Sequence, residues 1–90
     1  MGTFHQGKGE LHGITVVVET SGPEMYVGRC DDVTELGVIL HDADVHREGD
    51  ETPREKYLER AVRFGIWKKF DRIVIPNDAV TGIRRLGELT

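Results

Sequence analysis

An aromatic and basic run in the second half of the chain carries the residue types best suited to binding chemistry. The run, RFGIWKKF, covers residues 63–70 and places Trp67 directly before Lys68 and Lys69. On surfaces that bind single-stranded nucleic acid, aromatic rings stack on bases while lysines contact phosphates. These three residues therefore predict a nucleic-acid contact.

The same run also fits a packing role. Phe64, Trp67 and Phe70 recur three residues apart, and aromatics at helical spacing usually belong to a core. In this alternative the three rings form a seam that docks a helix on the rest of the domain or on a neighbouring subunit. We favour packing at this point, and the nucleic-acid interpretation stays open beside it.

Asp42, Asp44 and His46 alternate along the chain and would share one face of a strand with Leu40. Two carboxylates and an imidazole are metal ligands in principle. No second ligand cluster stands at a useful spacing, so we interpret the three residues as the solvent-exposed end of a strand that runs into an acidic loop. We expect no metal and no cofactor.

No residues in the sequence have the pattern of an activated nucleophile and its base. The lone cysteine, Cys30, precedes Asp31 and Asp32, whose negative charges disfavour a thiolate and raise the pKa of the thiol. A catalytic thiol at this position is therefore not expected. The sequence predicts a protein that is not an enzyme.

A chain of 90 residues makes one domain, whose core buries only a little more than about 60% of the surface of the unfolded chain. The lone cysteine rules out an internal disulfide and favours a reducing, cytoplasmic compartment. No stretch approaches the roughly 20 apolar residues of a membrane span, so no membrane contact is expected. Residues 1–12, which include His5 and His12, predict a flexible tail before a single domain over residues 13–88.

Charge is unevenly distributed along the chain. The formal net charge is -4, yet acidic residues dominate residues 31–51 and basic residues dominate residues 54–72. The basic segment suits either an acidic partner or the acidic half of a neighbouring subunit, and the net charge does not distinguish the two.

Five stretches with strand patterns position these residues. β-branched and apolar residues recur at every second position in them, and Gly28 permits the sharp bend that a small barrel requires. In the first stretch Ile14, Val16 and Val18 share an apolar face, while the opposite face is mixed. The predicted strands cover residues 13–19, 24–29, 38–45, 72–76 and 80–86.

A helix is predicted between the third and fourth strands. Thr52, Pro53 and Glu55 form a capping-box pattern. In this pattern the threonine hydroxyl accepts a hydrogen bond from the backbone N–H of Glu55, the glutamate carboxylate accepts one from the backbone N–H of Thr52, and proline takes the first helical position. Gly65 then either caps the C-terminus or allows close packing. The helix is expected over about residues 53–66, within an inserted acidic loop and helix over residues 46–70, and its apolar stripe is Tyr57, Leu58, Ala61, Val62, Gly65 and Ile66.

The order of bends and turns resembles that of the Sm and Sm-like family. The similarity lies in a bent first strand after Gly13, a second strand that ends in glycine, Leu40-His-Asp-Ala43 in the third strand, and the closing segment from Ile75 to Val80. The resemblance implies a mostly β fold, namely a small, strongly bent, five-stranded SH3-like or Sm-like barrel with one inserted helix.

Members of this family pair their fourth and fifth strands between subunits, in hexameric or heptameric rings. The resemblance therefore implies a homo-oligomeric ring, which would also cover the open edges of the sheet. The subunit interface is expected on Ile73, Val74 and Ile75 of the fourth strand and on Ile83 of the fifth.

The residues with which family members bind uridine-rich RNA are mostly replaced. Those members use an Asp and an Asn in the loop before the third strand and an Arg-Gly pair in the turn before the fifth. Here Gly37 takes the Asn position, residues 33–34 lie in the region of the Asp, and Pro76-Asn77 replaces the Arg-Gly pair. The Asn77 amide is left as a base contact, with no cation beside it.

Two hypotheses on function follow. The first is an Sm-like ring-forming subunit, associated with single-stranded RNA or part of a ribonucleoprotein or regulatory assembly, which binds through a non-standard surface. The alternative is an SH3-like structural or protein–protein adaptor module without nucleic-acid binding. The candidate nucleic-acid contacts are Trp67, Lys68, Lys69, Asn77 and Arg84.

Overall fold

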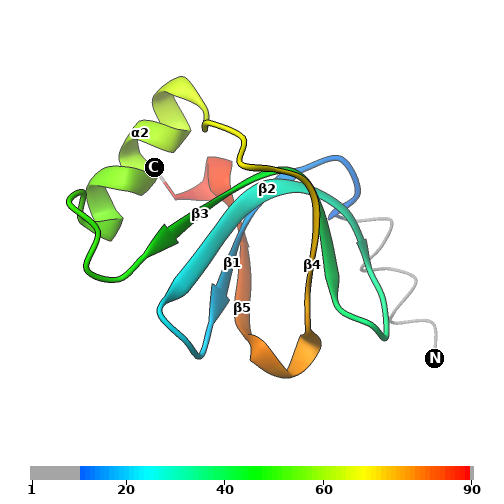
Figure 1. Cartoon of the computed structure of the whole chain (residues 1–90). Helices are drawn as coiled ribbons and strands as arrows, with labels where there is room; N and C mark the ends of the chain where they lie inside the picture. The colour runs from blue at the N-terminus through cyan, green and yellow to red at the C-terminus, as the bar shows by residue number, and fades with distance from the viewer. Residues whose placement is uncertain (1–10, 90) are drawn as a thin grey trace.

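The structure, a computed structural model, describes residues 11–89 and consists of a strongly bent five-stranded antiparallel sheet with a helix against it (Figure 1). The strand order is β4-β3-β2-β1-β5, so β4 and β5 form the two edges of the sheet. The predicted small bent barrel with an inserted helix is confirmed. The elements are β1 (Thr15–Thr20), β2 (Glu24–Val33), β3 (Val38–Arg47), α2 (Arg54–Phe64), β4 (Phe70–Ile75), the short 3-10 helix η1 (Asn77–Ala79), β5 (Val80–Arg85) and the 3-10 helix η2 (Leu86–Glu88).

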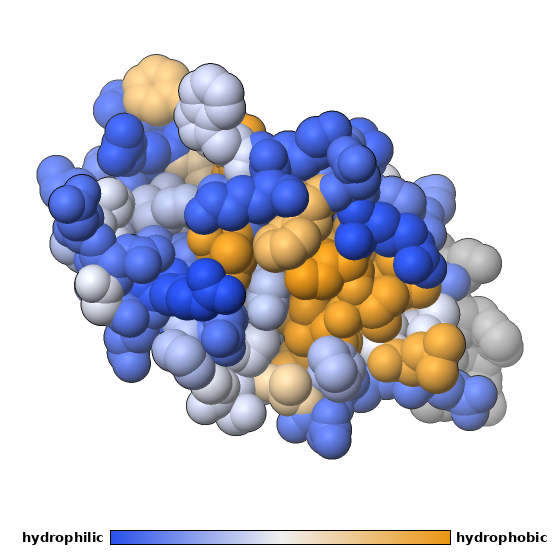
Figure 2. All heavy atoms as spheres, viewed as in Figure 1, coloured by the Kyte–Doolittle hydropathy of each residue, from blue (hydrophilic) through white to orange (hydrophobic). Residues whose placement is uncertain are grey.

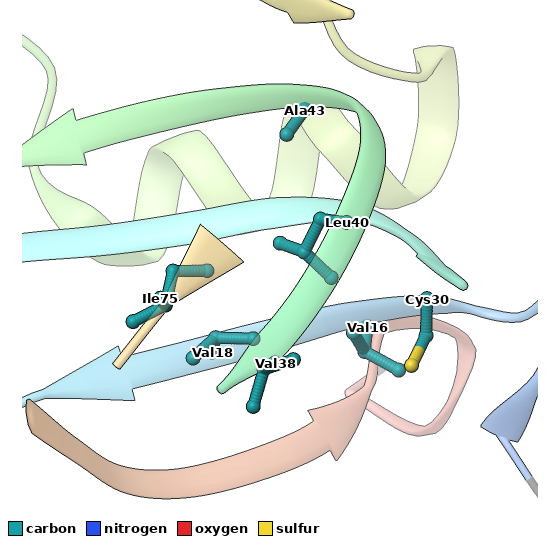
Figure 3. Close-up of a cluster of buried hydrophobic side chains, with 7 residues drawn as sticks. All are labelled: Val16, Val18, Cys30, Val38, Leu40, Ala43 and Ile75. Carbon is teal, nitrogen blue, oxygen red and sulfur yellow. The ribbon is translucent and has the colours of Figure 1, made fainter. Parts of the chain in front are cut away.

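Strand β1 is buried on both faces. Val16 and Val18 belong to the cluster inside the barrel (Figure 3), whereas Val17 belongs to a second cluster under α2. The alternation predicted for this strand is confirmed, and its second face is core as well because the inserted helix covers it. Burying one such valine completely is worth about 1.5–3 kcal/mol. The interior cluster consists of Val16, Val18, Cys30, Val38, Leu40, Ala43 and Ile75.

The bend of β2 and β3 depends on the close approach of two small residues. A Cβ added at Gly28 would lie 2.8 Å from the Cβ of Ala43, so only glycine fits there. The register between the strands shifts beside Gly28, and Asp42 has φ 51, in the left-handed region. As a result Ala43 joins Leu40 in the interior, and the predicted sharing of one face by Leu40, Asp42 and Asp44 is wrong.

Helix α2 forms where the sequence predicts it, but its first turn is built differently. The N-cap is Pro53, in an extended conformation and without a side-chain capping bond. Thr52 therefore lies outside the helix and Glu55 at its second position, so the predicted capping box is wrong. At the other end Gly65 has φ 84 and donates its N–H to the carbonyl O of Ala61, which makes it the C-terminal cap.

A buried polar group fixes α2 on the sheet. The Tyr57 hydroxyl donates to Oδ2 of Asp44 at 2.8 Å, and the Tyr57 ring lies 5.0 Å from that of His46. The His46 Nε2–H donates to the carbonyl O of Thr52 at 2.6 Å. Both Asp44 and His46 are 6% exposed. The interpretation of these residues as a solvent-exposed strand end is therefore wrong, because the helix covers them.

Within residues 11–89 no group of three or more His, Cys, Asp or Glu side chains is arranged to hold a metal ion, and no helix there is long and apolar enough to cross a membrane. The predicted tail, including His5, lies mostly outside the described residues. Its last two residues contact the barrel, since Leu11 packs against the interior cluster and the His12 Nδ1–H donates to the carbonyl O of Asp31.

Candidate functional site

The turn before β5 lies against the loop before β3, and together they form what we call the turn surface, residues 34–37 and 76–79. The Asn77 Nδ2 donates to the carbonyl O atoms of Thr34 and Glu35, at 2.7 and 3.2 Å. A Cβ on Gly37 would come within 2.9 Å of the Ile75 carbonyl carbon and closer still to its oxygen, and Gly37 has φ +147. Glycine at position 37 thus lets the loop pack on the end of β4.

The turn surface has little to offer an RNA phosphate. Both donors of the Asn77 amide are engaged within the chain, so the base contact expected from it competes with two internal hydrogen bonds. The exposed side chains beside it are acidic or apolar: Glu35, Asp78 and the 80% exposed Leu36. An approaching phosphate would meet negative charge here.

Arg84 lies on the outer face of β5 and is engaged in an ion pair. Its Nη2 is 2.9 Å from Oε2 of Glu19, which also lies 3.5 Å from Nη1 of Arg54. The two arginines border a groove of about 750 Å³ between α2 and the C-terminal turn. Arg85 turns to the other side, toward Glu88. Because two arginines share the single carboxylate of Glu19, part of their positive charge is not offset. The described residues that line this groove include no aromatic ring on which a base could stack.

Lys68 and Lys69 both face carboxylates. The Lys68 Nζ lies 2.8 Å from Asp71 and 3.8 Å from Asp42, and the Lys69 Nζ lies 3.7 Å from Asp44. The hydrogen bond and charge of Asp71 raise the pKa of Lys68. The two lysines therefore tie the α2–β4 connection to the bend of β3, and neither is a free cation next to Trp67.

Trp67 borders an open cleft at the C-terminal end of α2, which we call the aromatic cleft. The cleft has a volume of about 610 Å³. Trp67 is 89% exposed and Phe64 is 80% exposed. Arg60 also borders the cleft and supplies its positive charge. The floor includes Tyr57 and Asp44. The arrangement combines two accessible rings, a guanidinium and a carboxylate whose charge Lys69 partly offsets.

The prediction that three aromatic rings pack between the helix and the barrel of the same chain is wrong for two of the three. Phe70 packs against the interior cluster, but Phe64 and Trp67 stand in solvent. The physical reason is Gly65, which ends α2 and takes Trp67 off the helical spacing. Sequence reasoning missed Arg60, although Tyr57, Arg60 and Phe64 follow one another at spacings of three and four and so share a helix face.

The predicted subunit-interface residues lie on the two edges of the sheet. Among the described strands β4 pairs only with β3, and β5 only with β1, so each keeps one side without a described partner. Ile73 and Ile83 are half-buried and pack against the interior cluster, Val74 is half-buried, and Ile75 is buried. Figure 2 shows apolar side chains gathered along β4, between hydrophilic areas.

Comparison with known proteins identifies the fold. No protein-family model matches the chain, and no curated protein matches it in sequence. Among solved structures, the Sm protein of Pyrococcus abyssii in complex with a uridine heptamer matches with a TM-score of 0.60 and 22% identity, over 86% of this chain and 89% of that chain. At this identity the likeness establishes the fold: the chain has an Sm-like fold, as the sequence predicts.

Proposed function

We propose that this Sm-like barrel is a non-enzymatic, RNA-associated subunit of a homo-oligomeric ring that belongs to a ribonucleoprotein or regulatory assembly. The observation that carries the proposal is the Sm-like fold, shared with a protein whose solved structure contains a uridine heptamer. The buried free thiol of Cys30, whose pKa is raised by burial and then by Asp32 and Asp31, fits a reducing, cytoplasmic compartment.

The free edges of the sheet support the ring. β4 and β5 lie at opposite ends of the strand order and carry unpaired backbone groups beside apolar side chains. Exposed edges of this kind favour pairing with another chain. Pairing β4 of one copy with β5 of the next is a head-to-tail contact, which closes into a ring when the rotation per copy fits. The proposed contact residues are Ile73, Val74, Ile75 and Ile83.

Native mass spectrometry tests the assembly. We expect the mass of a hexamer or heptamer, and we expect Val74→Lys to lower it to that of a monomer because a charge on an edge strand opposes pairing. Lys56→Ala, on the exposed surface of α2, is the control that keeps the ring. A monomer or simple dimer in the unmodified protein would contradict the ring.

Fluorescence anisotropy with labelled oligo-U and oligo-A tests the RNA association. We expect binding at low salt that weakens as salt is added, because phosphate contacts release counterions. Absence of binding to both oligonucleotides at low salt would remove RNA from the proposal. The acidic turn surface would then favour the second candidate, a protein–protein adaptor, since exposed Leu36 flanked by carboxylates suits a protein partner better than a phosphate backbone.

A further inference from the structure

Two solvent-exposed aromatic rings on one small cleft are an unusual use of apolar surface. Among the described residues the large apolar side chains that are strongly exposed are Leu36, Phe64 and Trp67, and two of these three border the aromatic cleft. Exposing both rings forgoes the stabilisation that burying them would give, about 1.5–3 kcal/mol for a side chain as large as Phe. Within residues 11–89 neither ring belongs to a hydrophobic cluster of the fold, so both can contact a ligand.

The charges around the cleft favour an anionic partner at its rim. None of the ion pairs among the described residues includes Arg60 or Arg63. Both arginines are exposed on α2, and Arg60 borders the cleft. This contrasts with Lys68 and Lys69, whose charges are offset by Asp42, Asp44 and Asp71.

The floor of the cleft has the opposite preference. Asp44 lies there as a buried carboxylate that accepts from the Tyr57 hydroxyl and from the backbone N–H of Val45. Lys69 offsets part of this charge. The carboxylate still favours amino donors over a phosphate, because carboxylates accept hydrogen bonds, as they do from the exocyclic amino group of cytosine. A ligand that fits both parts is flat and apolar, carries amino donors, and is attached to an anion.

We propose that the aromatic cleft binds one nucleobase of single-stranded RNA, with Trp67 and Phe64 as the stacking surface and Arg60 as the contact to the adjoining phosphate. This inference rests on the proposed RNA association and gives it a site. The cleft precedes β4 and the turn surface follows it, so the two lie at opposite ends of that strand (Figure 1). The RNA therefore binds on the α2 side of the barrel.

Repetition in the proposed ring would strengthen a contact that is weak in one subunit. Each copy presents one cleft, and a strand that engages the first finds the next at high effective concentration. Stacking on aromatic side chains tolerates any base because every base has a π face. The carboxylate floor adds a preference for adenine and cytosine, which carry exocyclic amino groups, over uracil.

Trp67 is the single tryptophan of the chain, so tryptophan emission reports on this cleft alone. We expect labelled oligo-A to quench the emission along the same curve that its anisotropy follows. Trp67→Ala should weaken oligo-A binding about 5- to 150-fold, with Trp67→Phe intermediate. Arg60→Ala should weaken it less and lower the salt slope by about 0.7. Lys56→Ala, one helical turn from Arg60, is the matched control with no expected effect.

The two readouts separate the cleft from the RNA association itself. If oligo-A changes the anisotropy while Trp67 emission stays constant and Trp67→Ala binds with unchanged affinity, the cleft is not the site, although the RNA association stands. If neither oligo-A nor oligo-U changes the anisotropy at low salt, the RNA association fails and this site with it. Oligo-U binding as tightly as oligo-A would remove the role of the Asp44 floor.

Discussion

The turn surface and the aromatic cleft lie at the two ends of β4 and differ in how much of their chemistry is already used. At the turn surface the Asn77 amide donors, the loop backbone and the space over Gly37 are all occupied by the chain itself. At the aromatic cleft two rings and an arginine have no such partners in the part of the chain that the structure describes. An Sm-like fold therefore does not by itself decide which surface of this barrel carries accessible binding groups.

The largest expected effect comes from placing an asparagine at Gly37, on the turn surface. Gly37→Asn places a Cβ in contact with the carbonyl of Ile75 and forces a side chain onto φ +147. Backbone strain and overpacking each cost about 1–3 kcal/mol, so we expect a loss of roughly 3 kcal/mol in unfolding free energy. Urea denaturation followed by circular dichroism measures it, and no gain in oligo-U affinity is expected.

Gly49→Ala is the matched control for this substitution. Gly49 also has a positive φ, 95, but a Cβ there meets nothing within 4 Å. It therefore carries the conformational cost without the clash, and we expect a loss of about 1 kcal/mol. Equal losses in the two variants would show that the contact with Ile75 is not what excludes a side chain at Gly37.

The next effect concerns the support of the aromatic cleft. Tyr57→Phe removes the hydroxyl that donates to buried Asp44, and an unsatisfied buried acceptor costs about 1–3 kcal/mol. Thermal unfolding at neutral pH measures the loss. Tyr26→Phe is the control, because Tyr26 packs against the interior cluster and its hydroxyl makes no hydrogen bond with the described residues. Similar losses in both would contradict the Tyr57–Asp44 anchor.

The same hydroxyl gives the fold a dependence on alkaline pH. Burial, and then the hydrogen bond to Asp44, raise the pKa of Tyr57. The folded chain therefore holds this proton more tightly than the unfolded chain, in which the pKa of tyrosine is about 10. The stabilisation is complete below that pH and is lost as the pH rises above it. The difference in stability between the unmodified protein and Tyr57→Phe should shrink from pH 9 to pH 11.

The barrel could be predicted from the sequence because its signals are local. Alternation of β-branched residues, the glycine at the bend and the helical stripe after residue 53 each depend on neighbours along the chain. The left-handed conformation of Asp42 is not such a signal, and this one residue moves Ala43 into the interior and frees Asp44 to meet Tyr57. The capping box predicted from Thr52 and Glu55 was wrong because the helix begins one residue later, with Pro53 as the N-cap.

The candidate site was predicted in part. The sequence indicated Trp67 as a candidate contact because it is an aromatic residue beside two lysines. Its spacing of three from Phe64 favoured a packed helix face instead, but this spacing places two residues on one face only if both belong to the helix. Because Gly65 ends α2 with a positive φ of 84, the helical spacing does not extend beyond that residue. The ion pairs of Lys68 and the meeting of Asp44 with α2 depend on distant parts of the chain, which no local pattern shows.

A smaller effect is expected when the turn surface is opened. Asn77→Ala removes two hydrogen bonds to the loop before β3. Each is worth about 0.5–1.5 kcal/mol, with the lower end expected at an exposed site. Hydrogen exchange should quicken at the amides of Thr34 and Gly37, while oligo-A affinity stays the same. Asp78→Asn, the neighbouring exposed residue, should leave the exchange unchanged. Weaker RNA binding by Asn77→Ala without faster exchange would make the turn surface the RNA site.

The smallest expected effect is on the stability of Trp67→Ala. A tryptophan in a core costs about 3–5 kcal/mol when truncated, whereas an exposed residue without special contacts changes stability by no more than about 0.5 kcal/mol. Since Trp67 is 89% exposed, we expect a thermal midpoint close to that of the unmodified protein at a concentration where both have the same mass. A large loss would mean that the ring is buried in solution, against the same chain or a neighbour. An unchanged midpoint together with weaker oligo-A binding would assign the ring to the ligand, because packing and binding then differ at this one residue.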